Sequence, residues 1–175
     1  SGMVRRNSYR YPGVIESAYM LDEMTVEIIA DGRHLPPSIL SLVYRSKGPD
    51  KTALVTDSMR AAGMPDGKSI LGSLSAGQEV IVEEGVAKMP DRTAFAGSVA
   101  TADRLVRNMV QLAHVPLIDA VRMMTSTPAR IASISSKGIL AGGSDADVVL
   151  FDDDVTVWKT LVGGKVVYTA PSSID

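Results

Sequence analysis

The most constraining feature of this chain is a repeated pattern in which an apolar strand ends on polar residues. The first strand, Thr25–Ala30, is rich in β-branched residues and runs into the polar segment Asp31–His34. Apolar residues recurring over 38–45, just after two prolines, favour a helix. A second apolar strand, Thr52–Thr56, ends at Asp57. Strand, polar end, helix and strand in this order predict a parallel α/β fold.

The polar residues at the two strand ends are the first candidates for chemistry. In α/β barrels the reactive groups lie where strands end, so His34 and Asp57 are expected on one rim. Asp57 could serve there as a general acid and base, or it could simply cap a helix or a turn. His34 could contact a ligand, or it could be a structural imidazole whose hydrogen bonds are satisfied within the protein.

The middle of the chain departs from this pattern and then returns to it. Alternating residues at 79–82 and 85–88 predict a β-hairpin, an insertion near 76–90. Ala94–Ser98 is interpreted as a short strand tip, and its backbone N–H groups lie just before a helix, where a polar ligand can bind. Helices are expected over 101–113 and 116–124, with a third starting at 127.

In the C-terminal part, apolar and polar residues alternate again, and this pattern predicts antiparallel strands. Expected strands cover 147–151, 155–162 and 165–168, with Gly163-Gly164 as a two-residue turn. We therefore divide the chain into a partial barrel, residues 1–136, and strands of a small β-sandwich domain, residues 137–175.

Composition narrows the function further. The chain of 175 residues has no cysteine, two histidines and a formal net charge of -2. This balance gives no reason to expect nucleic acid or an acidic membrane as a partner. The segment that opens the chain has no apolar core of the kind found in signal peptides, so a cytoplasmic protein is expected.

Taken together, the motifs of this chain resemble the C-terminal half of the N-acetylglucosamine-6-phosphate deacetylases, a family of the amidohydrolase superfamily. The pair Ile-Ala-Asp-Gly-x-His and Leu-Val-Thr-Asp is the most specific part, whereas the tail motifs occur across many amidohydrolases. The matching stretches are Arg10–Gly13, Ile28–His34, Leu54–Met59, Ala62–Gly63, Ala96–Ser98, Thr127–Arg130, Gly138–Leu140, Gly143–Asp147 and Lys159–Gly164.

The resemblance implies a (β/α)8 barrel with a small β-sandwich domain, and the hydrolysis of N-acetylglucosamine 6-phosphate to glucosamine 6-phosphate and acetate. Asp57 matches the catalytic aspartate, which activates a metal-bound water and then protonates the leaving amine. His34 matches the histidine that contacts the substrate, and Arg10 matches the arginine that meets the sugar phosphate. The remaining substrate-binding positions are Asp31, Gly32, Arg33, Phe95, Ala96 and Gly97.

The same resemblance places the metal ligands, a glutamate and two histidines, in a part of the barrel that precedes this chain. We expect a divalent ion, zinc or iron, in a homodimeric full-length enzyme and no metal ligands in this chain. The chain is thus interpreted as a fragment that is inactive alone. Two alternatives remain open: another metal-dependent amidohydrolase, or a non-catalytic partial barrel that assembles with another chain.

Overall fold

The computed structural model describes residues 3–171, apart from the side chains of Arg5 and Arg6, so the outermost ends of both expected domains lie outside it. Its centre is the expected unit of two parallel strands. Strand β3 (Val26–Ile28) pairs with β4 (Thr52–Leu54), with Val26 opposite Thr52 and Ile28 opposite Leu54. Helix α2 (Pro37–Lys47) connects them and starts at the predicted prolines. The parallel strand–helix–strand prediction is confirmed.

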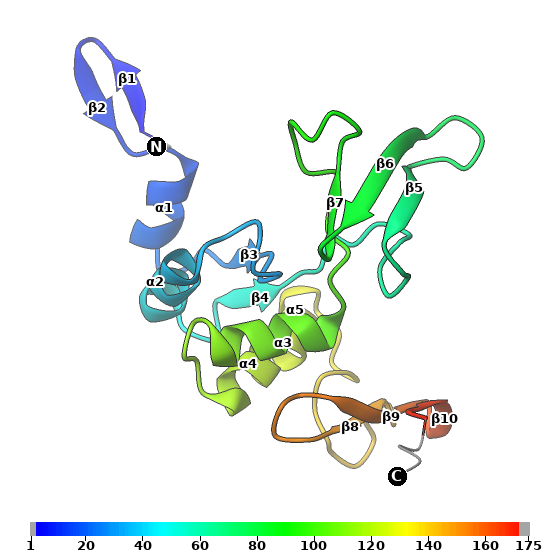
Figure 1. Ribbon diagram of the computed structural model, residues 1–175. Coiled ribbons are helices and arrows are strands. Elements are labelled where there is room, and N and C mark those ends of the chain that lie inside the picture. Colours follow the sequence, from blue (N-terminus) through cyan, green and yellow to red (C-terminus); the bar gives the residue numbers. More distant parts are fainter. Residues whose placement is uncertain (1–2, 172–175) are drawn as a thin grey trace.

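Three helices pack against this strand pair on one side (Figure 1). They are α3 (Ala102–Gln111), α4 (Leu117–Met124) and α5 (Ser126–Ile131), close to their expected positions. Their apolar faces and the two strands bury one hydrophobic core, which fixes where β3 and β4 end. Its largest fully buried side chains are those of Leu40, Leu54, Leu105, Met109 and Met123.

A second, smaller core lies under an antiparallel sheet that follows β4. Strands β6 (Gln78–Glu83) and β7 (Val86–Lys88) form the expected hairpin. The sequence pattern missed a third strand, β5 (Gly67–Leu71), which pairs with β6. This second core contains Met59, Ala61, Val80, Val82, Ala87, Ala96 and Val99.

The segment Ala94–Ser98 differs from the expectation, because it is not a continuous strand. It makes two isolated bridges instead, Phe95 antiparallel to Lys88 and Ser98 parallel to Ser58. The segment thereby links the β7 edge to the chain that leaves β4. It lies between the two cores.

An arm that no sequence pattern predicted leads into the fold. Strands β1 (Val4–Arg6) and β2 (Tyr9–Tyr11) form an antiparallel hairpin, followed by helix α1 (Val14–Met20). In Figure 1 the hairpin extends beyond α1, away from β3 and β4.

The C-terminal strands form a sheet of their own in the order β10-β9-β8. They are β8 (Val148–Phe151), β9 (Val157–Val162) and β10 (Lys165–Thr169). We expected Val155 inside the second of these strands, but it has φ 59° and is buried in the main core, so β9 starts two residues later. No helix in the described part of the chain is long and apolar enough to cross a membrane.

Candidate active site

The loop that follows β3 folds around one buried carboxylate, that of Asp31. Its Oδ1 accepts hydrogen bonds from the backbone N–H groups of Arg33 and His34, each at 2.9 Å. Its Oδ2 lies 2.9 Å from Nδ1 of the His34 ring. The Asp31 side chain is only 1% exposed, whereas that of His34 is 23% exposed. The loop therefore shields the Asp31 carboxylate from solvent and leaves part of the His34 imidazole accessible.

The ionisation of Asp31 follows from these contacts. Burial alone would raise the pKa of this carboxyl group, because it penalises the charge. The N–H groups of His34 and Arg33, together with the His34 ring, favour the carboxylate more strongly, and the pKa is lowered overall. Asp31 is consequently a charged acceptor at neutral pH.

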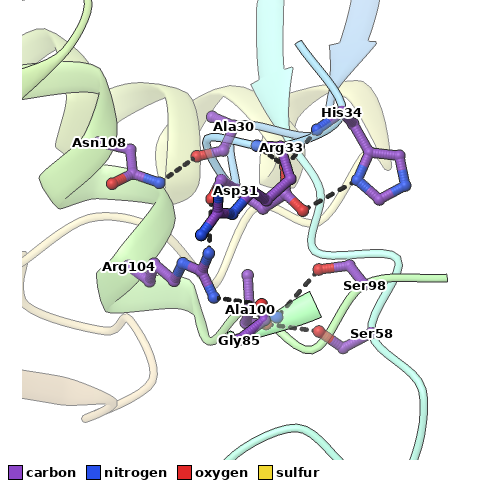
Figure 2. A network of polar contacts seen from close by, with 10 residues as sticks. All are labelled: Ala30, Asp31, Arg33, His34, Ser58, Gly85, Ser98, Ala100, Arg104 and Asn108. Atoms are coloured by element: carbon purple, nitrogen blue, oxygen red, sulfur yellow. Dashed lines mark hydrogen bonds and ion pairs between the residues drawn. The ribbon is translucent and has the colours of Figure 1, made fainter. Parts of the chain in front are cut away.

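Helix α3 holds the same loop from its other side, through the backbone (Figure 2). The Asn108 side-chain amide donates to the Ala30 carbonyl at 2.9 Å. The Arg104 guanidinium donates to the carbonyls of Asp31 and Gly85, both at 2.9 Å, and so connects the loop to the β6–β7 turn. Arg33 reaches the neighbouring Glu84 carbonyl at 3.2 Å.

Asp57 lies just beyond β4, where the chain passes from the first core to the second. Its φ of 46° is in the left-handed region, which non-glycine residues adopt rarely and which is often found at functional sites. Its carbonyl accepts the Ser98 N–H at 3.1 Å, and the Ser98 carbonyl accepts the Met59 N–H at 2.9 Å. The side chain is exposed, and no described residue makes a hydrogen bond to its carboxylate. Its carboxylate therefore faces solvent.

The segment 95–98 brings the two loops together. The Phe95 ring lies against His34, with 5.1 Å between ring centroids and a tilt of 54°. Ala96 is buried in the second core. Gly97 has φ 77°, and a Cβ there would lie 3.5 Å from the Asp57 carbonyl oxygen. Residues 95–97 thus link the His34 ring to the backbone of Asp57, and together these residues make up the candidate site.

Arg10 is the predicted site residue that the fold does not bring to this group. It lies on β2, opposite Arg5, and is exposed. The hairpin carries it away from β3 and β4 (Figure 1).

The described residues do not form a metal-binding cluster by themselves. Between residues 3 and 171, which the structure describes, no group of three or more His, Asp or Glu side chains lies close enough together to hold a metal ion.

Sequence reasoning missed the α3 residues that position the loop. The prediction of this helix used only the apolar residues on one of its faces. Arg104 and Asn108 are four residues apart and therefore share one polar edge of the helix, next to its apolar face. Two polar residues at this spacing, each directly before a buried residue (Leu105 or Met109), could have indicated a polar edge beside the core. The spacing does not indicate what that edge binds.

The fold thus places a buried aspartate, a partly exposed histidine and an exposed aspartate in the segments that follow two parallel strands of an α/β unit. The chain matches the amidohydrolase family over residues 5–167, and it belongs to that family. It is 36% identical over 158 residues to an N-acetylglucosamine-6-phosphate deacetylase of Lysinibacillus sphaericus, covering 90% of this chain and 40% of that protein. It is 34% identical to a putative N-acetylgalactosamine-6-phosphate deacetylase of Escherichia coli K12, covering 90% of this chain and 91% of that protein.

Solved structures agree with these relationships. The N-acetylglucosamine-6-phosphate deacetylase of Thermotoga maritima superimposes with a TM-score of 0.80 at 32% identity, covering 90% of this chain and 42% of that one. A mutant of the Mycobacterium smegmatis enzyme in complex with N-acetyl-D-glucosamine-6-phosphate gives a TM-score of 0.81 at 34% identity, covering 90% and 41%. This chain thus spans about 40% of the length of most of the relatives that it matches.

Proposed function

We propose that this chain supplies the acid–base and sugar-binding part of a deacetylase that converts N-acetylglucosamine 6-phosphate to glucosamine 6-phosphate and acetate, in amino-sugar catabolism. The observations that carry the proposal are the contact of the Phe95 ring with His34 and the close approach of Gly97 to the Asp57 carbonyl, both beyond the ends of the parallel strand pair. Relatives of that name at 34–36% identity support the same substrate class.

In the proposed reaction, Asp57 moves a proton between water and the leaving nitrogen. Its carboxylate takes a proton from water as the water oxygen adds to the carbonyl carbon of the N-acetyl group. The C–N bond then breaks, the proton passes from Asp57 to the departing amine, and acetate remains. The exposed position of the carboxylate and its fixed backbone suit this role.

The loop 31–34 and the segment 95–97 would line the sugar. His34 offers a partly exposed ring, Gly32 and Arg33 belong to the same loop, and Phe95 to Gly97 would form the opposite side. Arg10 is proposed for the phosphate, because a guanidinium can bind phosphate through two parallel hydrogen bonds. Within this chain it lies on the β1–β2 arm, so this part of the proposal rests on its match to the family motif and its exposure.

We further propose that residues 1–136 belong to a (β/α)8 barrel, and residues 137–175 to the small β domain. Because the chain spans about 40% of most relatives, the activity is proposed for the protein that also contains the rest of the barrel. The divalent metal ion that amidohydrolases generally use would be bound there. The same protein is proposed to be cytoplasmic and homodimeric.

A second substrate follows from one specific observation. Relatives described as N-acetylgalactosamine-6-phosphate deacetylases are 34% identical to this chain, nearly as similar as those named for the glucosamine epimer. Both sugar phosphates therefore belong in any assay.

The proposal is tested by complementation. The chain is mixed with a polypeptide comprising the part of the Lysinibacillus sphaericus relative that precedes the matched region, and acetate release is measured with each epimer and added zinc or iron. We expect turnover only when both polypeptides are present. Asp57→Asn should lower it by about 10²–10⁴-fold or more, because the amide cannot accept the proton.

The control variant is Asp153→Asn, which removes an exposed carboxylate from the β8–β9 turn and should leave turnover unchanged. If the Asp57→Asn mixture still forms a complex and deacetylates normally, Asp57 is not the acid–base group. If the complex forms but neither sugar phosphate is hydrolysed, the proposed function is wrong.

A further inference from the structure

We propose that Asp31 is a positioning residue, which holds His34 with its proton on Nδ1 and thereby presents Nε2 as a hydrogen-bond acceptor to a sugar hydroxyl. The ligand half of this inference rests on the proposed function. It changes the role expected for Asp31, which the family resemblance placed among the substrate contacts.

The first argument is that the Asp31 carboxylate is fully used inside the protein. Three N–H donors surround it, the backbone groups of Arg33 and His34 and the ring Nδ1, all at 2.9 Å. With 1% of its side chain exposed, it has no surface to offer a ligand. Its effect on a ligand is therefore indirect, and the side chain that it holds is that of His34.

The second argument concerns which ring nitrogen carries the proton. An ionised carboxylate only accepts hydrogen bonds, so a contact of 2.9 Å from Asp31 Oδ2 to Nδ1 requires hydrogen on Nδ1. In the neutral ring Nε2 then has a lone pair. A lone pair accepts from a hydroxyl, and a sugar has several hydroxyls to donate.

The third argument is that the ring has little freedom to turn. Asp31 holds the Nδ1 edge, and Phe95 lies against the ring at 5.1 Å between centroids. Turning the ring over would break the contact with Asp31 and leave that buried carboxylate short of one donor, which is unfavourable.

The fourth argument is that the loop itself is anchored independently of any ligand. Arg104 and Asn108 bind the carbonyls of Asp31 and Ala30, and Arg104 also binds the Gly85 carbonyl in the β6–β7 turn (Figure 2). These bonds fix the backbone from which both Asp31 and His34 project. The geometry is thus preorganised, which reduces the ordering cost of binding.

The test uses the chain labelled with ¹⁵N-histidine, whose only two histidines are His34 and His114. Long-range ¹H–¹⁵N spectra at about pH 8.5, where an ordinary imidazole is neutral, report the tautomer of each ring. We expect His34 with its proton on Nδ1, and exposed His114 with the Nε2–H pattern of an unconstrained imidazole. A wild-type His34 with its proton on Nε2 would overturn the proposal without any variant.

Asp31→Asn should convert most of His34 to the Nε2–H form, because an amide no longer requires a donor at Nδ1. The matched control is Asp103→Asn. It removes another partly buried aspartate, one that pairs with Arg107 at 2.9 Å and does not contact His34. The control should leave the His34 tautomer unchanged. If both variants alter it equally, the effect is a general loss of structure and Asp31 has no special role.

Titration with glucosamine 6-phosphate separates this inference from the proposed function. We expect His34 Nε2 to shift in the wild-type chain and the affinity to fall about 2- to 10-fold in Asp31→Asn, the effect of one neutral hydrogen bond. If the Nδ1–H tautomer is found but the ligand leaves both rings unchanged, the positioning role stands and the proposed sugar site is wrong.

Discussion

Gly32 in the His34 loop provides a sharp test of how tightly α3 holds that loop. Its φ is +79°, and a Cβ added there would lie 3.2 Å from Asn108 Nδ2 and 3.3 Å from Leu112 Cδ1. We expect Gly32→Ala to cost about 1–2 kcal/mol for the left-handed backbone. The Leu112 side chain is 38% exposed and can move aside. Asn108 cannot, because its amide donates to the Ala30 carbonyl, and weakening that bond adds about 1 kcal/mol.

The matched control is Gly63→Ala. Gly63 has nearly the same φ, +74°, but a Cβ there meets no atom within 4 Å. Urea unfolding of the chain should therefore show a loss of about 2–3 kcal/mol for Gly32→Ala and about 1–2 kcal/mol for Gly63→Ala.

A double-mutant cycle with Asn108→Ala then isolates the steric part. Once Asn108 is truncated, the bond to the Ala30 carbonyl is already lost, so adding Gly32→Ala should cost only the backbone term. We expect a coupling of about 1 kcal/mol between the two positions. Equal costs for Gly32→Ala with and without Asn108 would refute the idea that this amide clamps the loop.

Three further predictions concern the proposed activity and the loop. In the complemented enzyme, Arg10→Ala should raise KM for the phosphorylated sugar about 10- to 150-fold and affect unphosphorylated N-acetylglucosamine much less; equal losses would make Arg10 structural. Because the pKa of Asp31 is lowered on folding, its stabilising contribution is present above the ordinary aspartate pKa and is lost as pH falls through its lower folded value. Amide exchange at His34 should thus accelerate only under acid, and acceleration near neutrality would contradict this. Finally, the isolated chain should retain no stoichiometric metal and release no acetate, as elemental analysis and an acetate assay would show.

The strand pattern predicted the centre of the fold because it is a local signal. Thr52–Leu54 is buried on every residue, and an uninterrupted apolar run of this kind indicates a parallel strand covered on both faces. The positions of His34 and Asp57 follow from the same signal, since each comes just after a strand. Their positions beyond the two strands were therefore predictable in outline, whereas the backbone link through residues 95–98 was not.

The parts that sequence reasoning missed lack such a signal. Strand β5 carries a glycine, a lysine and a serine in its first three positions, and it is defined only by its pairing with β6. In the β1–β2 hairpin, all three residues of β2 are exposed, so this strand shows no alternation between buried and exposed residues. Pairing partners, and not side-chain pattern, determine these elements.

The polar edge of α3 shows most clearly what separates fold prediction from site prediction. Leu105 and Met109 are fully buried, and this requirement makes the helix amphipathic and visible in the sequence. Arg104 and Asn108 bind carbonyl oxygens 73 and 78 residues away, and carbonyls are the same at every position of the chain. The residue types at positions 30 and 31 therefore do not predict these contacts, which involve only their backbone carbonyls. Helix α3 therefore has two functions on adjacent faces. Its apolar face packs in the core and is predictable from the sequence. Its polar edge holds the loop that carries His34, and that contact is seen only in the structure.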